Sequence, residues 1–287
     1  MMATLRIKGR GGLLRASLAA AALAAALVCA PAGQAAAQET VDLQATYFIS
    51  VSGLTVGRAE VRGRFAEGQY ATAISGSTLG ISRFVTDARA EMSGNGRIRG
   101  SKILPNSYNL DTREGDLVTL VRMAMNGGAV TRVEARPHLV EAPDRVPIRQ
   151  SDKRDVVDPL GAFVVSLERE RHFDGNAVCN RTVRVFDGWQ RFDVRLFYRH
   201  DKRIKGAYDG KAIVCGARYV PVAGHRPGRP VVEYMSENKR LEVWMVPVEG
   251  TDVMVPYQLL IGTSVGDLLI TAREFRVGGS GRQAAVR

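Results

Sequence analysis

The segment 261–270 contains the pattern G-x-S-x-G, which in serine hydrolases holds a nucleophilic serine between a strand and a helix. Ser264 is the serine of this pattern. The flanking segments 253–261 and 267–277 both have strand-like composition, so the pattern predicts a hairpin turn. Such a hydrolase also needs a histidine after the serine, and no histidine follows His225. We therefore predict that Ser264 has no catalytic role.

The other residues with chemical potential are scattered along the chain. No two histidines, and no histidine and cysteine, lie at a metal-ligand spacing; the histidines are His138, His172, His200 and His225. Asp111, Glu114 and Asp116 cluster around a predicted turn, but a calcium loop needs more oxygen ligands. Phosphate-binding and dinucleotide-binding motifs are absent from the sequence. We expect no metal, no cofactor and no enzymatic activity; an enzyme without a recognisable motif is the third alternative.

The N-terminal segment predicts export. Residues 1–15 carry four basic residues and no acid, and an apolar run up to Cys29 follows. The small residues at 35–37 fit a cleavage site, so we predict a signal peptide over 1–37, cleaved between Ala37 and Gln38. An uncleaved N-terminal anchor is the alternative. Cleavage would remove the four charges and lower the net charge from +11 to +7. We expect a soluble periplasmic chain without a transmembrane span.

Two cysteines remain after this segment, Cys179 and Cys215. An even pair in an exported chain predicts a disulfide, which would contribute about 2–4 kcal/mol to stability. The sequence has no C-x-x-C motif, so a thiol-redox role lacks support.

Basic residues fall into two groups. Four are predicted on the outward faces of neighbouring strands and three at the next turn: Arg184, Arg191, Arg195, Arg199, Lys202, Arg203 and Lys205. A solvated face explains them, and contact with anionic lipid head groups is the alternative. Nucleic acid is not expected as a partner of an exported protein.

Period-two alternation of apolar and polar residues dominates the chain. In 190–199, Phe192, Val194 and Leu196 alternate with charged residues, which is typical of a half-buried strand. Asn-Gly and Asp-Gly pairs mark hairpin turns. Further strands are predicted at 43–51, 59–65, 69–75, 87–93, 102–110, 117–125, 129–135, 182–187, 211–220, 231–235, 240–248, 253–261 and 267–277. The pattern predicts a mainly antiparallel all-β domain over 38–277, a curled sheet or an open or closed β-barrel, with a disordered tail at 278–287.

One segment has helical periodicity. Asp158 and Pro159 suit a helix start, and the apolar residues Leu160, Phe163, Val164 and Leu167 follow at helical spacing. We predict a helix over 158–171 that covers the sheet, a shorter helical turn at 79–84 and a loop over 137–155. The strand at 240–248, which holds Trp244, is apolar on both faces, so it needs cover on both sides. A filled core with the helix as cover explains this, and an apolar ligand cavity is the alternative.

Several segments resemble a known family. "NGRIRGSKILPNSY", "DPLGAF", "YDGKAIVCGARYVPV" and "LEVWMVPVEGTDVMVPYQLLIGTSVGDLLITAREF" are similar to exported proteobacterial proteins of the domain-of-unknown-function family numbered 3108. The resemblance covers roughly 42–277 and implies a periplasmic, largely β protein without an established activity or catalytic residues. We expect a non-enzymatic envelope protein that binds an apolar or amphiphilic ligand, or a partner protein, in support of envelope integrity. The alternative is a structural or interaction module with a filled core.

Overall fold

A computed structural model of the chain describes residues 40–79, 87–167 and 174–279. The predicted signal peptide with its junction between Ala37 and Gln38, nearly all of the predicted helical turn at 79–84, and His172 lie outside the described residues. The tail predicted from residue 278 starts too early, because the last strand includes Gly278 and Gly279.

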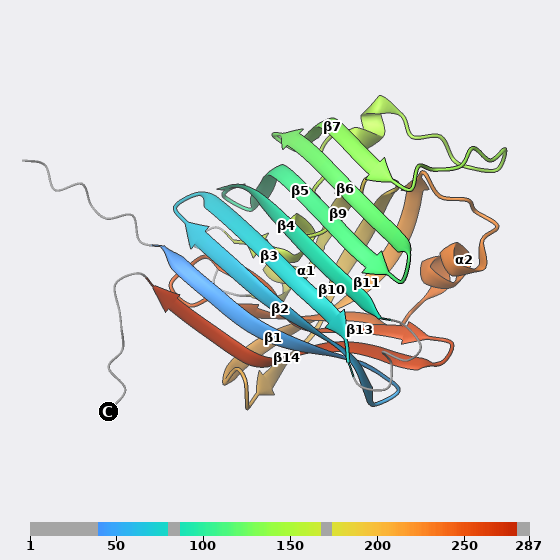
Figure 1. The fold of residues 1–287 in the computed structure, drawn as a ribbon. Helices are drawn as coiled ribbons and strands as arrows, with labels where there is room; N and C mark the ends of the chain where they lie inside the picture. The colour runs from blue at the N-terminus through green and yellow to red at the C-terminus, as the bar shows by residue number, and fades with distance from the viewer. Residues whose placement is uncertain (1–39, 80–86, 168–173, 280–287) are drawn as a thin grey trace, which may run out of the picture. The chain divides into compact units, whose positions relative to one another are not determined.

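The strands form one large antiparallel sheet (Figure 1), in the order β7-β6-β5-β4-β3-β2-β1-β14-β13-β12-β11-β10-β9, with β8 paired to β13. The first seven strands are β1 (Val41–Val51), β2 (Leu54–Ala66), β3 (Gln69–Thr78), β4 (Ala88–Arg99), β5 (Lys102–Glu114), β6 (Leu117–Asn126) and β7 (Ala129–Arg136). The others are β8 (Val165–Ser166), β9 (Arg181–Phe186), β10 (Arg191–Ile204), β11 (Gly210–Ala223), β12 (Leu241–Pro247), β13 (Val253–Thr263) and β14 (Gly266–Gly279). The all-β prediction is therefore confirmed, in its open, curled form.

Helical elements within the described residues are few and short: η2 (Gln150–Lys153), η3 (Gly161–Phe163), α1 (Gly175–Cys179) and α2 (Pro230–Glu237). The strand predicted at 231–235 is wrong, because this segment lies within α2. Pro230 occupies the start of α2, where its fixed φ suits a helix and its missing N–H costs nothing.

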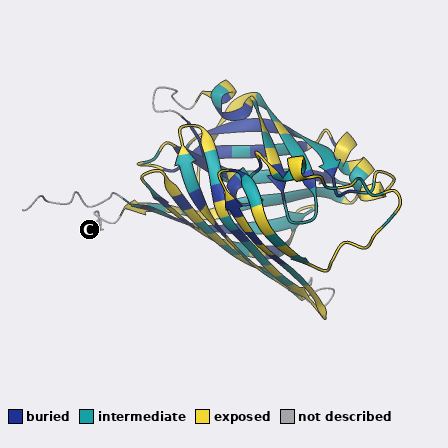
Figure 2. Cartoon of the chain, turned by 90° about the horizontal axis from the view of Figure 1, so that it is seen from above, coloured by how far each residue is buried: buried dark blue, intermediate teal, exposed yellow. Residues whose placement is uncertain are grey.

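The two ends of the sheet approach each other without pairing. The indole Nε1–H of Trp189, in the β9–β10 turn, donates to the Pro137 carbonyl after β7 at 2.9 Å. Further along the space between β7 and β9, the backbone N–H of Val156 donates to the Gly128 carbonyl, and the backbone N–H of Val157 donates to the Arg184 carbonyl. Residues 155–157 thus bridge β9 and the β6–β7 turn, so the sheet curls into an open barrel (Figure 2), with buried residues gathered toward its interior.

We call the open barrel the curl. Because its strands are antiparallel, the turns lie at two ends of it. The β1–β2, β5–β6, β9–β10 and β13–β14 turns lie at the same end as α2, which connects β11 to β12. We call this end the α2 rim. The β2–β3, β4–β5, β6–β7, β10–β11 and β12–β13 connections lie at the other end, which we call the opposite rim.

The helix predicted over 158–171 is wrong as far as the structure describes this segment. After the single turn of η3, the backbone at Val164 is extended, and β8 pairs with β13. Three of the four predicted apolar residues are nevertheless buried, with Leu160 3%, Val164 5% and Leu167 5% exposed, whereas Phe163 is 40% exposed. A helix would direct them to one side, whereas the extended chain places apolar side chains on both sides and fills the curl from within. We call residues 158–167 the strap.

Candidate functional site

An apolar cavity of about 370 Å³ lies inside the curl. Its wall is the inner face of β9 to β13, and the strap and α2 cover it. The strand residues that line it are Val183, Val185, Phe192, Val194, Leu196, Ala217, Tyr219, Leu241, Glu242, Val243, Met245, Leu259, Leu260 and Ile261. Pro159, Ala162, Phe163 and Val165 come from the strap, and Met235 comes from α2.

Strand alternation explains why these side chains converge. Val194 lies opposite Tyr219 and Leu196 lies opposite Ala217 in the β10–β11 pair. Because alternate residues of a strand lie on one face, most of the lining residues recur at every second position, and Glu242 and Leu260 are the exceptions. The alternation was visible in the sequence for 190–199, but the hollow that it encloses was not.

Charge is almost absent from the cavity wall. Glu242 is the only charged residue among the lining residues, and its carboxylate accepts a hydrogen bond from Arg199 Nη1 at 2.6 Å. Tyr219 packs its ring against Phe192, with ring centroids 5.2 Å apart. A hollow with this lining offers little to a polar solute, whereas it suits an acyl chain or another apolar group.

The cavity reaches toward the α2 rim. Phe163 lines it and is 40% exposed, and Met235 contributes from α2 itself. Leu241 and Ile261, which face each other near the rim ends of β12 and β13, also line it. The side of the cavity nearest α2 is therefore lined by apolar side chains.

A second hollow of about 770 Å³ lies on the other side of the strap, between the β4–β5 and β6–β7 turns, α1 and β9. Its lining is more polar and includes Lys102, Asp155 and Arg181. Burial lowers the pKa of Arg181, whose Nη2 donates to the Ala177 carbonyl at 2.6 Å. Ala162 and Val165 border both hollows, so the strap is the wall between them.

Asp158 anchors the start of the strap. It is fully buried, and its Oδ1 accepts the N–H of Leu160 at 2.9 Å and of Gly161 at 3.1 Å. Burial raises the pKa of Asp158 to about 6, although these hydrogen bonds oppose the rise. Its Oδ2 and the Tyr70 hydroxyl have no hydrogen-bond partner among the described residues. A Cβ on Gly161 would lie 2.9 Å from Oδ2 and 3.0 Å from that hydroxyl, so the turn leaves no room for a side chain.

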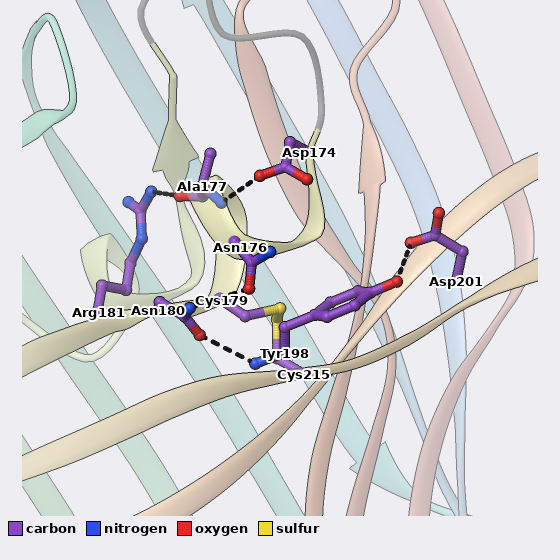
Figure 3. Close-up of a disulfide and its surroundings, with 9 residues drawn as sticks. All are labelled: Asp174, Asn176, Ala177, Cys179, Asn180, Arg181, Tyr198, Asp201 and Cys215. Carbon is purple, nitrogen blue, oxygen red and sulfur yellow. Dashed lines mark hydrogen bonds between the residues drawn. A yellow bond between two sulfur atoms is a disulfide. The ribbon is translucent and has the colours of Figure 1, made fainter.

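The disulfide predicted between Cys179 and Cys215 is present (Figure 3) and joins α1 to β11. Around it, Asp174 Oδ2 accepts the Ala177 N–H at 3.1 Å, and Asn180 Oδ1 accepts the Tyr198 N–H at 3.2 Å. Both cysteines are buried in the cluster that contains Val243 and Met245, two residues of the cavity wall. The disulfide therefore fixes α1 against the inner face of the sheet beside the cavity.

Ser264 lies in the exposed two-residue turn between β13 and β14, as predicted. The turn needs a positive φ at Gly266, where φ is +115° and a Cβ would meet the Ser52 hydroxyl oxygen at 1.9 Å. The other candidate polar residues that the structure describes do not gather into a cluster. His138 and His200 are exposed, and His225 is buried, which lowers its pKa. Asp111 pairs with Arg122 at 3.4 Å instead of joining a cluster.

Part of the predicted basic surface is paired within the chain. The outward position predicted for Arg191 is wrong, because this residue is 6% exposed and pairs with Asp193 at 2.7 Å. Arg203 pairs with Asp209 at 3.4 Å. Lys202 lies 4.2 Å from the centre of the Trp244 ring, a cation–π contact. With Arg199 bonded to Glu242, the positive potential of this surface is weaker than the sequence alone indicates.

Within the described ranges, acidic residues, histidines and cysteines do not gather into a group that can hold a metal ion. A helix long and apolar enough to cross a membrane is likewise not found among the helices that the structure describes.

The fold and the cavity define a class of protein: an open, curled antiparallel barrel with an apolar interior. Residues 44–273 match the family described as "Protein of unknown function (DUF3108)", and the chain belongs to this family. It is also similar to the crystal structure of a β-barrel-like protein of domain of unknown function DUF1849 from Brucella abortus, with a TM-score of 0.49 and 10% identity, over 83% of this chain and 98% of that chain. A comparison with curated proteins finds no match.

Proposed function

We propose that this protein is a non-enzymatic, exported protein of the periplasm that binds an apolar or amphiphilic ligand in support of the cell envelope. The apolar cavity between the strap and β9 to β13 carries this proposal. Its volume of about 370 Å³ falls within the range of small-molecule sites, about 300–1,000 Å³. The ligand's apolar part would occupy the hollow, and any polar group would remain near the α2 rim.

The compartment supports the proposal from the sequence side. The basic segment, the apolar run and the small residues at 35–37 are typical of a secretory signal peptide. A disulfide between Cys179 and Cys215 suits an oxidising compartment. An exported protein meets lipids and lipid-linked molecules, for which an apolar interior is the natural receptor.

The second candidate is a structural or interaction module without a ligand. The three buried clusters favour it, because they give the curl a substantial packed core of its own. The two candidates differ in one property: whether the hollow exchanges its contents with added amphiphiles. An enzyme that uses residues without a recognisable motif is the third candidate.

Native mass spectrometry tests the proposal directly. Protein purified without detergent and sprayed under gentle conditions is expected to carry a bound amphiphile, or to take up one equivalent of an added single-chain fatty acid. Collisional activation should release the ligand and leave the folded chain. A chain that stays free of adducts under both conditions would favour the structural module instead.

A further inference from the structure

We propose that the α2 rim docks on the surface of a zwitterionic phospholipid bilayer through the apolar side chains of its turns. This goes beyond ligand binding in the cavity and does not depend on it. The inference starts from an asymmetry in exposure. Among the described residues, every exposed large apolar side chain lies at the α2 rim, in the loop after β7, or in the strap beside the cavity.

Three hairpin tips and one helix carry the main apolar groups. Leu54 follows the β1–β2 turn and is 69% exposed, Leu117 follows the β5–β6 turn and is 57% exposed, and Val265 in the β13–β14 turn is 72% exposed. On α2, Val231 is 68% and Tyr234 is 42% exposed. More than half of the surface of the four aliphatic side chains remains in water, and Tyr234 keeps 42% exposed, so burial within the fold contributes little at these positions.

The opposite rim shows the contrast. Its turns carry Glu67 and Gly68, Asn126 and Gly127, or Glu249 and Gly250, and no exposed large apolar side chain is found there among the described residues. One end of the curl therefore has polar tips of the usual kind, and the other end has apolar ones. A difference of this kind between two ends of one sheet indicates that they face different surroundings.

The positions of the apolar side chains indicate a bilayer surface and not a rigid protein partner at the α2 rim. The apolar groups come from three separate hairpins and from α2, which are four different parts of the chain. A rigid protein partner would need a pocket for each tip, whereas a bilayer interface adapts to several separate side chains at once. Apolar and aromatic side chains that enter the boundary between head groups and acyl chains are the usual means of such docking.

Charge at the rim fits a zwitterionic surface better than an anionic one. The β1–β2 and β13–β14 turns, at residues 52–53 and 264–265, carry no charge. The β5–β6 turn carries Glu114 and Asp116 beside a single Arg113. On α2, Glu233 and Glu237 offset the flanking Arg229 and Lys239. The nearby Arg226 and Arg240 pair with Asp144 and Asp267. Anionic lipid would repel the acidic tip, so the docking would depend on apolar contact and not on counter-charge.

The geometry joins the rim to the interior. Met235 lines the apolar cavity, and its neighbour Tyr234 is exposed on the same helix. A molecule docked by this rim would hold the side of the cavity nearest α2 against the lipid. The bilayer would then be both the docking surface and the source of a ligand's apolar chain.

Flotation with vesicles of pure phosphatidylcholine tests the docking. The wild-type protein is expected to float with the vesicles, and a rise in salt should change the bound fraction little, because screening acts on charge. A triple variant, Leu54→Ser, Leu117→Ser and Val265→Ser, is expected to lower the partition coefficient at least about tenfold, since fully burying each such side chain is worth about that factor or more. The matched control, Gln69→Ser, Asn126→Ser and Glu249→Ser at the opposite rim, should float like the wild type.

Three results would overturn the docking: no flotation of the wild-type protein, equal flotation of the two triple variants, or binding that needs anionic lipid and disappears with salt. The last would assign membrane contact to the basic strand faces. Titration of both variants with a fluorescent fatty acid, without vesicles, separates the two proposals. The tip variant should keep wild-type affinity for the fatty acid, since none of its three positions lines the apolar cavity. Loss of flotation with fatty-acid binding retained supports docking alone.

Discussion

Asp158 Oδ1 accepts the backbone N–H of Leu160 at 2.9 Å, and neither residue has appreciable contact with solvent. The carboxylate caps the strap from inside the core, where a negative charge is costly. Burial is the main cause that raises the pKa of Tyr70, and the nearby charge of Asp158 raises it further. The strap is therefore held by a group whose charged form is disfavoured in the folded state.

Stability should depend on pH through this group. The pKa of Asp158 is about 6 in the folded chain and 3.8 without the fold, so protonation favours the folded state. The stabilisation that comes from protonating Asp158 is fully present below pH 3.8 and is lost as pH rises through 6. Asp158→Asn keeps an acceptor oxygen without the charge, so we expect it to stabilise the protein at pH 7.5 by up to about 3 kcal/mol. Urea unfolding at pH 7.5 and pH 5 measures this.

The comparison of the two pH values supplies the control. The gain from Asp158→Asn should shrink at pH 5, because the wild-type carboxyl is then largely protonated. Asp158→Ala removes the acceptor and should cost about 0.5–2 kcal/mol relative to Asp158→Asn at both pH values, the usual range for a cap. Identical pH dependence of unfolding in wild type and Asp158→Asn would contradict the buried position of the carboxylate.

Two residues of the strap should respond differently to truncation. Leu160 is 3% exposed, so Leu160→Ala is expected to cost about 2–5 kcal/mol. Phe163 is 40% exposed, so the cost of Phe163→Ala should be well below the 3–5 kcal/mol of a buried Phe. Phe163→Ala should instead change the affinity for a fluorescent fatty acid, because this side chain lines the cavity. Equal loss of stability in the two variants would contradict the different burial of Leu160 and Phe163 and would support the helix that the sequence predicted.

The disulfide should contribute to stability without taking part in any chemistry. A double change of Cys179→Ala and Cys215→Ala is expected to cost about 2–4 kcal/mol in urea unfolding. Reductant should lower the unfolding midpoint of the wild type and leave that of the double variant unchanged. If reductant shifts neither protein, the two cysteines are not bonded in solution.

Ser264→Ala should change the free energy of unfolding by less than about 0.5 kcal/mol, because the side chain is an exposed turn residue. A fluorophosphonate probe should not label the wild-type protein at Ser264. Mass mapping of a labelled peptide that contains this serine would contradict the assignment of 264–265 as a simple hairpin turn.

Much of the fold follows from local alternation. The strand of Phe192, Val194 and Leu196 was predictable because each side chain's face depends only on its parity in an extended chain. The Ser264 turn was predictable for a similar reason, since two strand patterns flank a Gly-containing turn of matching length. The pairing of Cys179 with Cys215 followed from the count of cysteines and the predicted export of the chain.

The failures come from tertiary context. Leu160, Val164 and Leu167 have helical spacing, but the interior of the curl surrounds the strap, so burial on several sides replaced the one-sided stripe. Val231 and Tyr234 suit a strand by composition, yet Pro230 starts a helix there. The apolar cavity needs wall residues from five strands whose spacing across the curl is not encoded in any single segment.

The most direct measurement of the central claim fills the cavity. Ala217 lines it and is 8% exposed, so Ala217→Leu places additional methyl groups in the hollow. We predict that fatty-acid affinity falls at least about tenfold, since the added groups take the space of the ligand, while the free energy of unfolding stays within about 1 kcal/mol of wild type. Ala71→Leu, on an exposed position of β3, is the matched control and should bind like wild type. Unchanged affinity in Ala217→Leu, or a loss of stability typical of an overpacked core, about 1–3 kcal/mol, would contradict the account of an open apolar cavity that takes a ligand.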